Sequence, residues 1–129
     1  MATIGLNHYN LRAPRDLMEA LKAFYCDVVG LRQGERPPFA FPGYWLYAGD
    51  AAVLHLSLAR PGETRATHAG TTFDHAAFTC TGLEETRSRL AGMKIPFEQA
   101  VVPASKCVQL FLQDPAGNGV ELNFPDGAA

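Results

Sequence analysis

Four side chains in this sequence are of types that hold divalent metals, namely His8, His55, His75 and Glu121. They fall at two nearly equal intervals, since His75 follows His8 by 67 residues and Glu121 follows His55 by 66. Each has apolar neighbours, among which a charged group is costly to bury unless it is paired or binds a metal. Three imidazoles and one carboxylate suit divalent iron, manganese, cobalt, nickel or zinc. The four residues therefore predict a site for one divalent metal ion.

The two intervals belong to an internal repeat of the chain. The stretch "GLNHYNL" at 5–11 matches "TFDHAAF" at 72–78. Likewise "VLHLSL" at 53–58 matches "GVELNF" at 119–124. We therefore predict one domain made of two modules. These modules cover residues 3–58 and 71–124, and a polar linker covers residues 59–70.

Each module shows the same order of expected elements. Strand patterns of the first module fall at residues 3–11, 31–36, 43–48 and 51–58, and those of the second at 72–80, 95–101, 106–113 and 119–124. Apolar residues at helical spacing predict a helix over 15–29, ended by Gly30, and a second helix over 82–93. Each module is therefore expected to be β-α-β-β-β, and the fold class to be α+β.

Strand alternation predicts which side chains share a face. His8 shares its face with Asn10 and Arg12, while Glu121 shares its face with Asn123. A pseudo-twofold arrangement of the modules would bring the two equivalent pairs of candidate ligands, His8 with His75 and His55 with Glu121, to one concave surface.

The composition limits the classes of partner. With 129 residues and a net charge of −2, the chain gives no electrostatic reason to expect nucleic acid or an anionic membrane as a partner. No stretch is long and apolar enough to span a bilayer. The three cysteines form no C-x-x-C pair, which favours packing roles and a reducing, cytoplasmic location.

The chain resembles the vicinal oxygen chelate superfamily, which includes glyoxalase I, extradiol dioxygenases, fosfomycin resistance proteins and bleomycin-binding proteins. The resemblance is carried by "GLNHYNLRAP", "AFYCDVVGL", "FDHAAF" and "LQDPAGNGVELNF". It implies two βαβββ modules that form a cup-shaped mixed β-sheet with flanking helices, and a metal held inside by His8, His55, His75 and Glu121. It also implies a homodimer, with each site formed within one chain or across two.

Details at single positions separate the subgroups. Arg12 has the spacing of an arginine that binds the glutathione carboxylate in glyoxalase I, but His55 stands where that enzyme usually has glutamate. Extradiol dioxygenases bind iron through residues that match His8, His75 and Glu121, and usually carry a tyrosine where this chain has Phe111. In fosfomycin resistance proteins a threonine stands in the region of Asn10. Bleomycin-binding members lack the metal ligands.

The expected activity is that of a glyoxalase-like lyase or isomerase. Its divalent metal would act as a Lewis acid on a small substrate with two adjacent oxygens, and Glu121 would act as the general base. The alternatives are an iron(II)-dependent extradiol-type dioxygenase acting on a catechol-like diol, and a small-molecule binding or antibiotic resistance protein. The candidate substrate-binding residues are Asn10, Arg12, Trp45, Tyr47, Gln109, Phe111 and Asn123.

Overall fold

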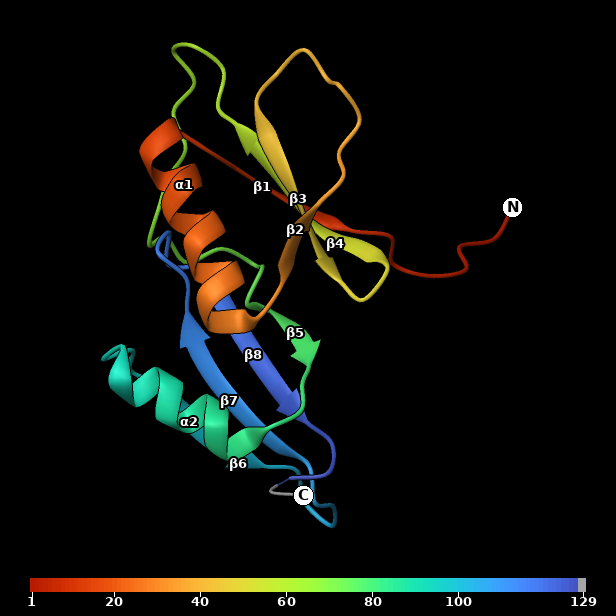
Figure 1. The fold of residues 1–129 in the computed structure, drawn as a ribbon, viewed down its shortest axis with the longest axis vertical. Coiled ribbons are helices and arrows are strands. Elements are labelled where there is room, and N and C mark those ends of the chain that lie inside the picture. The colour runs from red at the N-terminus through yellow and green to blue at the C-terminus, as the bar shows by residue number, and fades with distance from the viewer. Residues whose placement is uncertain (128–129) are drawn as a thin grey trace. The chain divides into compact units, whose positions relative to one another are not determined.

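The chain folds into two compact units, and their boundary lies inside the predicted linker. A computed structural model describes residues 1–127. The first unit covers Met1–Ala66, and the second begins at Thr67. Each unit has one four-stranded mixed sheet and one α-helix, so the fold class is α+β, as predicted (Figure 1).

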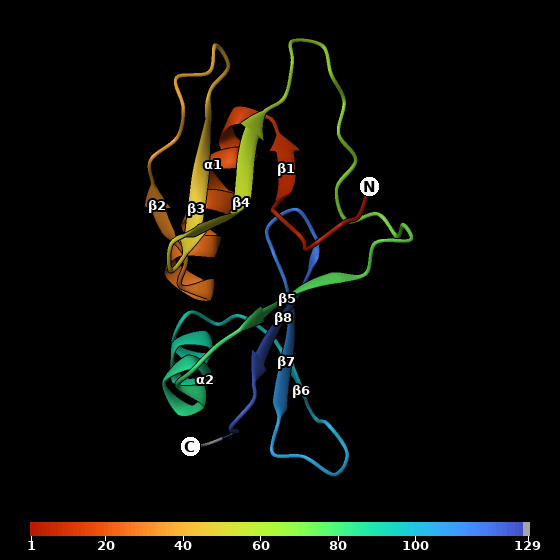
Figure 2. The ribbon, with the colours of Figure 1, turned by 90° about the vertical axis from the view of Figure 1, so that its right-hand side faces the viewer.

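The first unit has its strands in the order β1-β4-β3-β2. The strand β1 runs parallel to β4, and the other pairs are antiparallel. Figure 2 shows these four strands side by side, with α1 behind them. The elements are β1 (Tyr9–Ala13), α1 (Arg15–Phe24), a π-helical turn (Tyr25–Val29), β2 (Arg32–Gly34), β3 (Gly43–Ala48) and β4 (Ala51–Leu58).

The second unit repeats this topology, with the strand order β5-β8-β7-β6. Here β5 runs parallel to β8, and the remaining pairs are antiparallel. The predicted β-α-β-β-β order of both modules is therefore confirmed. The elements are β5 (His75–Thr79), α2 (Leu83–Gly92), β6 (Glu98–Val101), β7 (Val108–Gln113) and β8 (Gly119–Phe124).

The repeat extends to the register of the sheets. Trp45 on β3 lies opposite His55 on β4, and Phe111 on β7 lies opposite Glu121 on β8. The predicted equivalence of His55 and Glu121 is therefore a structural equivalence. In each unit the middle of the sheet carries one candidate ligand beside one aromatic ring.

Apolar side chains hold each helix on its sheet. Met18, Leu21 and Phe24 recur every third residue of α1 and are buried against the sheet. Pro14 immediately precedes α1, where its missing N–H costs no hydrogen bond of the helix. In the second unit Leu83 and Leu90 of α2 are buried. Because these layers cover one face of each sheet, the candidate ligands are left on the other face.

Several predicted boundaries differ from the structure, and three of the differences bear on the candidate site and on α1. The strand expected at 3–11 begins only at Tyr9, and Ile4 and Leu6 before it are 101% and 88% exposed. Among the described residues no strand pairs with this segment, so its apolar alternation has no sheet to join. His75 likewise begins β5, where the strand was expected from residue 72. The helix expected to Val29 changes to π-helical hydrogen bonding at Tyr25.

The three cysteines are free, and each is half-buried. Within residues 1–127 no helix is both long and apolar enough to cross a membrane.

Gly119 permits the close approach of β5 to β8. It pairs with His75 in the parallel ladder, and a Cβ atom at this position would collide with the carbonyl oxygen of Asp74 and lie 3.0 Å from the Cβ of His75. The start of β5, and with it the position of the His75 ring, therefore depends on a residue without a side chain.

We expect Gly119→Ala to lower the free energy of unfolding by about 1–3 kcal/mol, because the backbone of β5 must move away from β8. Urea unfolding measures this loss. The control is Gly70→Ala, since a Cβ atom at Gly70 would have no neighbour within 4 Å. Equal stability of the two variants would contradict a close approach at Gly119.

Candidate functional site

The carboxylate of Glu121 is buried and makes three polar contacts. The residue is 5% exposed. Its Oε1 lies 3.1 Å from Nε2 of His75. Its Oε2 accepts hydrogen bonds from Nδ2 of Asn123 at 2.9 Å and from Nε2 of Gln109 at 3.2 Å. Both carboxylate oxygens are thus held by groups on three different strands.

Strand alternation explains how these groups meet. Glu121 and Asn123 are two residues apart on β8 and so share a face, and Gln109 of β7 lies directly opposite Asn123. The intervening Leu122 points to the opposite, buried face. The structure therefore brings together four of the predicted site residues, namely His75, Gln109, Glu121 and Asn123.

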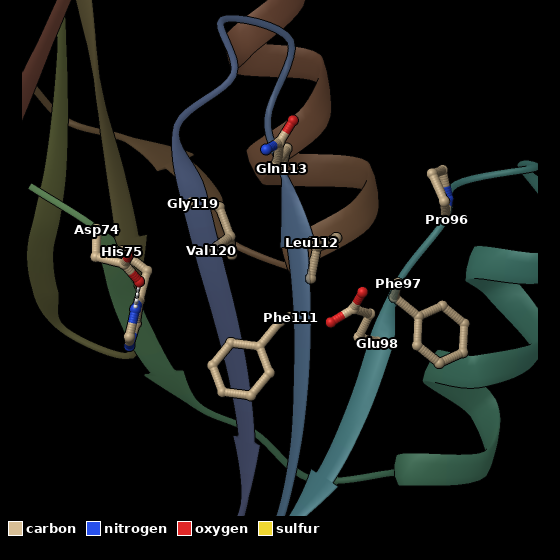
Figure 3. Close-up of a pocket in the computed structure, with 10 residues that line it drawn as sticks. All are labelled: Asp74, His75, Pro96, Phe97, Glu98, Phe111, Leu112, Gln113, Gly119 and Val120. Carbon is tan, nitrogen blue, oxygen red and sulfur yellow. Dashed lines mark hydrogen bonds and ion pairs between the residues drawn. The ribbon is translucent and has the colours of Figure 1, made fainter. Parts of the chain in front are cut away.

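His75 is held from both sides of its ring. Its Nδ1 lies 2.7 Å from Oδ2 of Asp74, drawn as the dashed line in Figure 3. A carboxylate oxygen can only accept, so Nδ1 carries the proton and Nε2 is the nitrogen that faces Glu121. The hydrogen bond to Asp74 raises the pKa of His75, partial burial opposes this effect, and the charge of Glu121 raises the pKa again. Between two carboxylates, His75 favours its protonated form.

An open groove lies beside His75. Its volume is about 620 Å³, a size typical of sites for small molecules. The ring of Phe111 stands edge-on to the His75 ring, with centroids 5.6 Å apart. Figure 3 shows the side chains that line the groove, which are Asp74, His75, Pro96, Phe97, Glu98, Phe111, Leu112, Gln113, Gly119 and Val120.

In the first unit the candidate ligands form a stack of rings. The rings of His8 and His55 are 3.7 Å apart and inclined by 15°. The indole of Trp45 stacks on the ring of His55, with ring centroids 4.2 Å apart and planes inclined by 10°. Lone pairs of imidazole nitrogens lie in the ring plane, so those of two parallel rings do not converge on one point. His8 must turn before it can share an ion with His55, and its place before β1 in an exposed segment leaves room to turn.

The residue before each repeat histidine orients its ring, and our reading of the sequence missed this role. Nδ1 of His8 lies 2.7 Å from Oδ1 of Asn7, as Nδ1 of His75 lies 2.7 Å from Asp74. In both cases Nδ1 donates its proton to the preceding residue, so Nε2 is the nitrogen that can bind a metal once it carries no proton, an arrangement typical of histidine ligands. The matched positions of Asn7 and Asp74 in the repeat were the available signal.

Burial and charge favour the neutral form of His55. Partial burial lowers its pKa, and the neighbouring charges of His8 and Arg36 lower it further. A neutral imidazole is the form that binds metal ions. The candidate ligand of the first unit is thus kept in its binding form, while that of the second unit is held as a cation by carboxylates.

The other predicted site residues of the first unit are already engaged. Nδ2 of Asn10 donates to Oγ of Ser57 at 2.8 Å. A guanidinium nitrogen of Arg12 donates to the carbonyl of Leu58 at 3.2 Å. The hydroxyl of Tyr47 donates to the carbonyl of Glu35 at 2.6 Å. These groups shape the sheet surface around His55, and a role in substrate binding stays a prediction for each.

Each unit brings together only two of the four candidate metal ligands. Among residues 1–127 no cluster of three or more His, Cys, Asp or Glu side chains has the geometry of a metal site. The structure instead pairs His8 with His55 and His75 with Glu121. The second pair fits a cation, because Nε2 and Oε1 face each other and a divalent ion can replace the proton between them. Joint binding by all four residues stays a prediction.

The comparison with protein families identifies the class of the chain. Residues 5–122 match the model of the Glyoxalase/Bleomycin resistance protein/Dioxygenase superfamily. The chain belongs to this superfamily, so the resemblance seen in the sequence is confirmed. No curated protein sequence matches the chain.

Solved structures share this fold at low sequence identity. A lactoylglutathione lyase from Agrobacterium tumefaciens is 23% identical, with 98% of this chain and 97% of that chain covered and a TM-score of 0.63. A glyoxylase/bleomycin resistance protein/dioxygenase domain from Frankia sp. EAN1pec is 15% identical, with 96% and 99% covered and a TM-score of 0.71. TnmS3, an antibiotic binding protein from Streptomyces sp. CB03234, is 18% identical, with 97% and 98% covered and a TM-score of 0.65.

We expect Asp74→Asn to destabilise the metal-free protein chiefly at mildly acidic pH. Because the folded-state pKa of His75 is raised, its protonation stabilises the fold below the unfolded value of about 6.5. This stabilisation is lost as the pH rises through the folded pKa. Urea unfolding should therefore separate the variant from the parent at about pH 5.5 and much less at about pH 8.5.

The exposed Asp50 offers a control, because Asp50→Asn removes the same charge from a turn of the first unit. A loss of stability in Asp74→Asn that did not change with pH would contradict the assigned role of Asp74.

Proposed function

We propose that the protein is a metal-dependent enzyme of the glyoxalase type, a lyase or isomerase acting on a small substrate with two adjacent oxygens. The observation that carries this proposal is the facing pair of His75 Nε2 and Glu121 Oε1, 3.1 Å apart beside an open groove. A buried carboxylate opposite an oriented imidazole is a donor set ready for a divalent cation. Membership of the superfamily supports the same class of chemistry.

The ligands of the proposed ion are His8, His55, His75 and Glu121, brought together within one chain or between two chains of a homodimer. A bound divalent ion would act as a Lewis acid, polarising the two substrate oxygens and stabilising negative charge on them. Zinc, nickel, cobalt, manganese and iron(II) all suit this set of nitrogen and oxygen donors.

Glu121 is the proposed general base. Gln109 and Asn123 both hold Oε2, which leaves Oε1 facing Nε2 of His75. A carboxylate positioned in this way can take a proton from a carbon next to a substrate carbonyl. The ring of Phe111 beside His75 excludes water from one side of the same position.

One observation favours a second function, which is the binding of a flat organic molecule without turnover. The rings of His8, His55 and Trp45 form an aromatic stack in the first unit. A related fold occurs in TnmS3, an antibiotic binding protein. The dioxygenase alternative has less support, because Phe111 offers no proton-donating hydroxyl at its position beside His75.

We expect the parent protein, purified without chelator, to hold about one divalent ion per site, and His75→Ala to hold less than a tenth of that amount. Elemental analysis by mass spectrometry measures both. His68→Ala is the control, since His68 lies outside the candidate ligands. Iron in the parent would favour the dioxygenase, and zinc, nickel or cobalt the lyase. A parent that took up no metal, even when metal was added, would rule out the proposed enzyme and favour the binding protein.

We expect Glu121→Gln to slow proton transfer by about 100-fold or more while metal is retained, because glutamine can still donate an oxygen but cannot accept the proton. Exchange of the carbon-bound hydrogens of hydroxyacetone in D₂O, followed by NMR, measures this step. Glu84→Gln on the surface of α2 is the control. Exchange at the parental rate by a metal-loaded Glu121→Gln protein would remove Glu121 from the role of base.

A further inference from the structure

The loop between β2 and β3 holds the guanidinium group of Arg36 against two phenyl rings. The guanidinium carbon lies 4.9 Å from the centroid of Phe39 and 5.0 Å from that of Phe41. The two rings are 5.3 Å apart and inclined by only 19°. This loop, coloured orange in Figure 1, leaves the sheet between β2 and β3. Its conformation thus fixes a positive charge beside a flat aromatic surface.

The charge of Arg36 has no counter-ion within residues 1–127, since none of the ion pairs found there includes it. One terminal nitrogen donates to the carbonyl of Phe41 at 2.9 Å. The Nε atom is buried and has no hydrogen-bond partner among the described residues. A buried donor without an acceptor is costly, so this group is suited to an acceptor that a ligand brings.

The same aromatic surface leads to a candidate metal ligand. Phe39 lies 6.2 Å from the indole of Trp45, which in turn stacks on His55. Phe39 and Phe41 are 45% and 44% exposed, so both side chains are accessible to a ligand.

We propose that Arg36, Phe39 and Phe41 form a binding site for the carboxylate and ring of a planar aromatic acid, and that this site selects the substrate. The inference rests on the proposed function, because the two adjacent oxygens of this acid would be those that reach the metal ligands. A guanidinium can donate two parallel hydrogen bonds to the two oxygens of a carboxylate. A conjugated ring matches the exposed phenyl faces.

We expect a ligand to reach the Nε atom through movement of the exposed loop that carries it. Nearly half of the surface of Phe39 and of Phe41 is free of protein contacts, and the loop that carries them has no regular secondary structure. A carboxylate that reached Nε would accept its hydrogen bond, while the phenyl rings would stay against the guanidinium. The site therefore discriminates by charge as well as by shape.

The test compares 3,4-dihydroxybenzoate with 3,4-dihydroxybenzamide, which has the same ring and adjacent oxygens but no charge. Isothermal titration calorimetry is carried out on the chelator-treated full-length protein. We expect the acid to bind at least about tenfold more tightly than the amide, because charge-assisted hydrogen bonds are about twice as strong as neutral ones. Arg36→Gln should abolish this preference, and Arg36→Lys should retain part of it, since lysine keeps the charge but not the fork.

Arg32→Gln is the matched control. Arg32 also lies over an aromatic ring, that of Tyr47, but it donates to the carbonyl of Gly49 and has no buried unpaired nitrogen. The preference for the acid should survive in this variant. Equal binding of acid and amide by the parent, or an unchanged preference in Arg36→Gln, would overturn the proposal.

The calorimetric preference for the acid and the uptake of metal test the two proposals separately. A preference for the acid in a protein that takes up no metal would leave the Arg36 site standing and remove the proposed enzyme activity. Metal uptake without any preference for the acid would leave the proposed enzyme activity standing and remove the Arg36 site. Cyclohexanecarboxylate tests the ring separately, since it carries the charge without a flat face, and binding as tight as that of the aromatic acid would overturn the part assigned to Phe39 and Phe41.

Discussion

The burial of one carboxylate among apolar residues constrains the whole second unit. Glu121 lies between Val120 and Leu122, which are 0% and 1% exposed and point into the core. A shift of β8 by one residue would exchange these faces, so the register that buries the core also fixes the carboxylate on the other side. Burial of this charge is tolerable because His75 and two side-chain amides surround it. The strand cannot slip without losing both sets of interactions.

The two units use one topology for different chemistry. In the second unit the residue opposite Phe111 is the carboxylate of Glu121, and the surrounding groups are hydrogen-bond donors. In the first unit the residue opposite Trp45 is His55, and the surrounding groups are rings. A carboxylate favours a neighbouring cation, whereas stacked rings favour a flat organic partner. The repeat thus supplies one ionic and one aromatic surface at equivalent positions.

The sequence was sufficient to predict the order of the helices and strands, because each element occurs twice in the repeat. The equivalence of His55 and Glu121, and the contact of Glu121 with Asn123 and Gln109, follow from strand alternation. The strand expected from residue 3 was wrong, because alternation shows which face a strand would bury and does not show whether a neighbouring strand pairs with it. Ile4 and Leu6 belong to an alternating apolar pattern, but no neighbouring strand among the described residues pairs with their segment.

Side-chain hydrogen bonds and ring contacts were harder to predict. The role of Asp74 depends on the rotamer of His75, which the alternation of residues along a strand does not predict. The position of Arg36 depends on the path of an irregular loop, where neither helical nor strand spacing applies. Only the folded loop shows that the rings of Phe39 and Phe41 both lie against the guanidinium. Local chemistry in loops is therefore the part of the site that needs a structure.

The stacking of Trp45 on His55 gives the protein a built-in optical signal. Trp45 is the sole tryptophan of the chain, so all indole fluorescence comes from one ring. That ring lies 4.2 Å from the imidazole of His55. A protonated imidazole quenches indole emission, and an arriving molecule or ion alters the contact. Events at this imidazole can therefore be followed in the unlabelled protein by the intensity and colour of its emission.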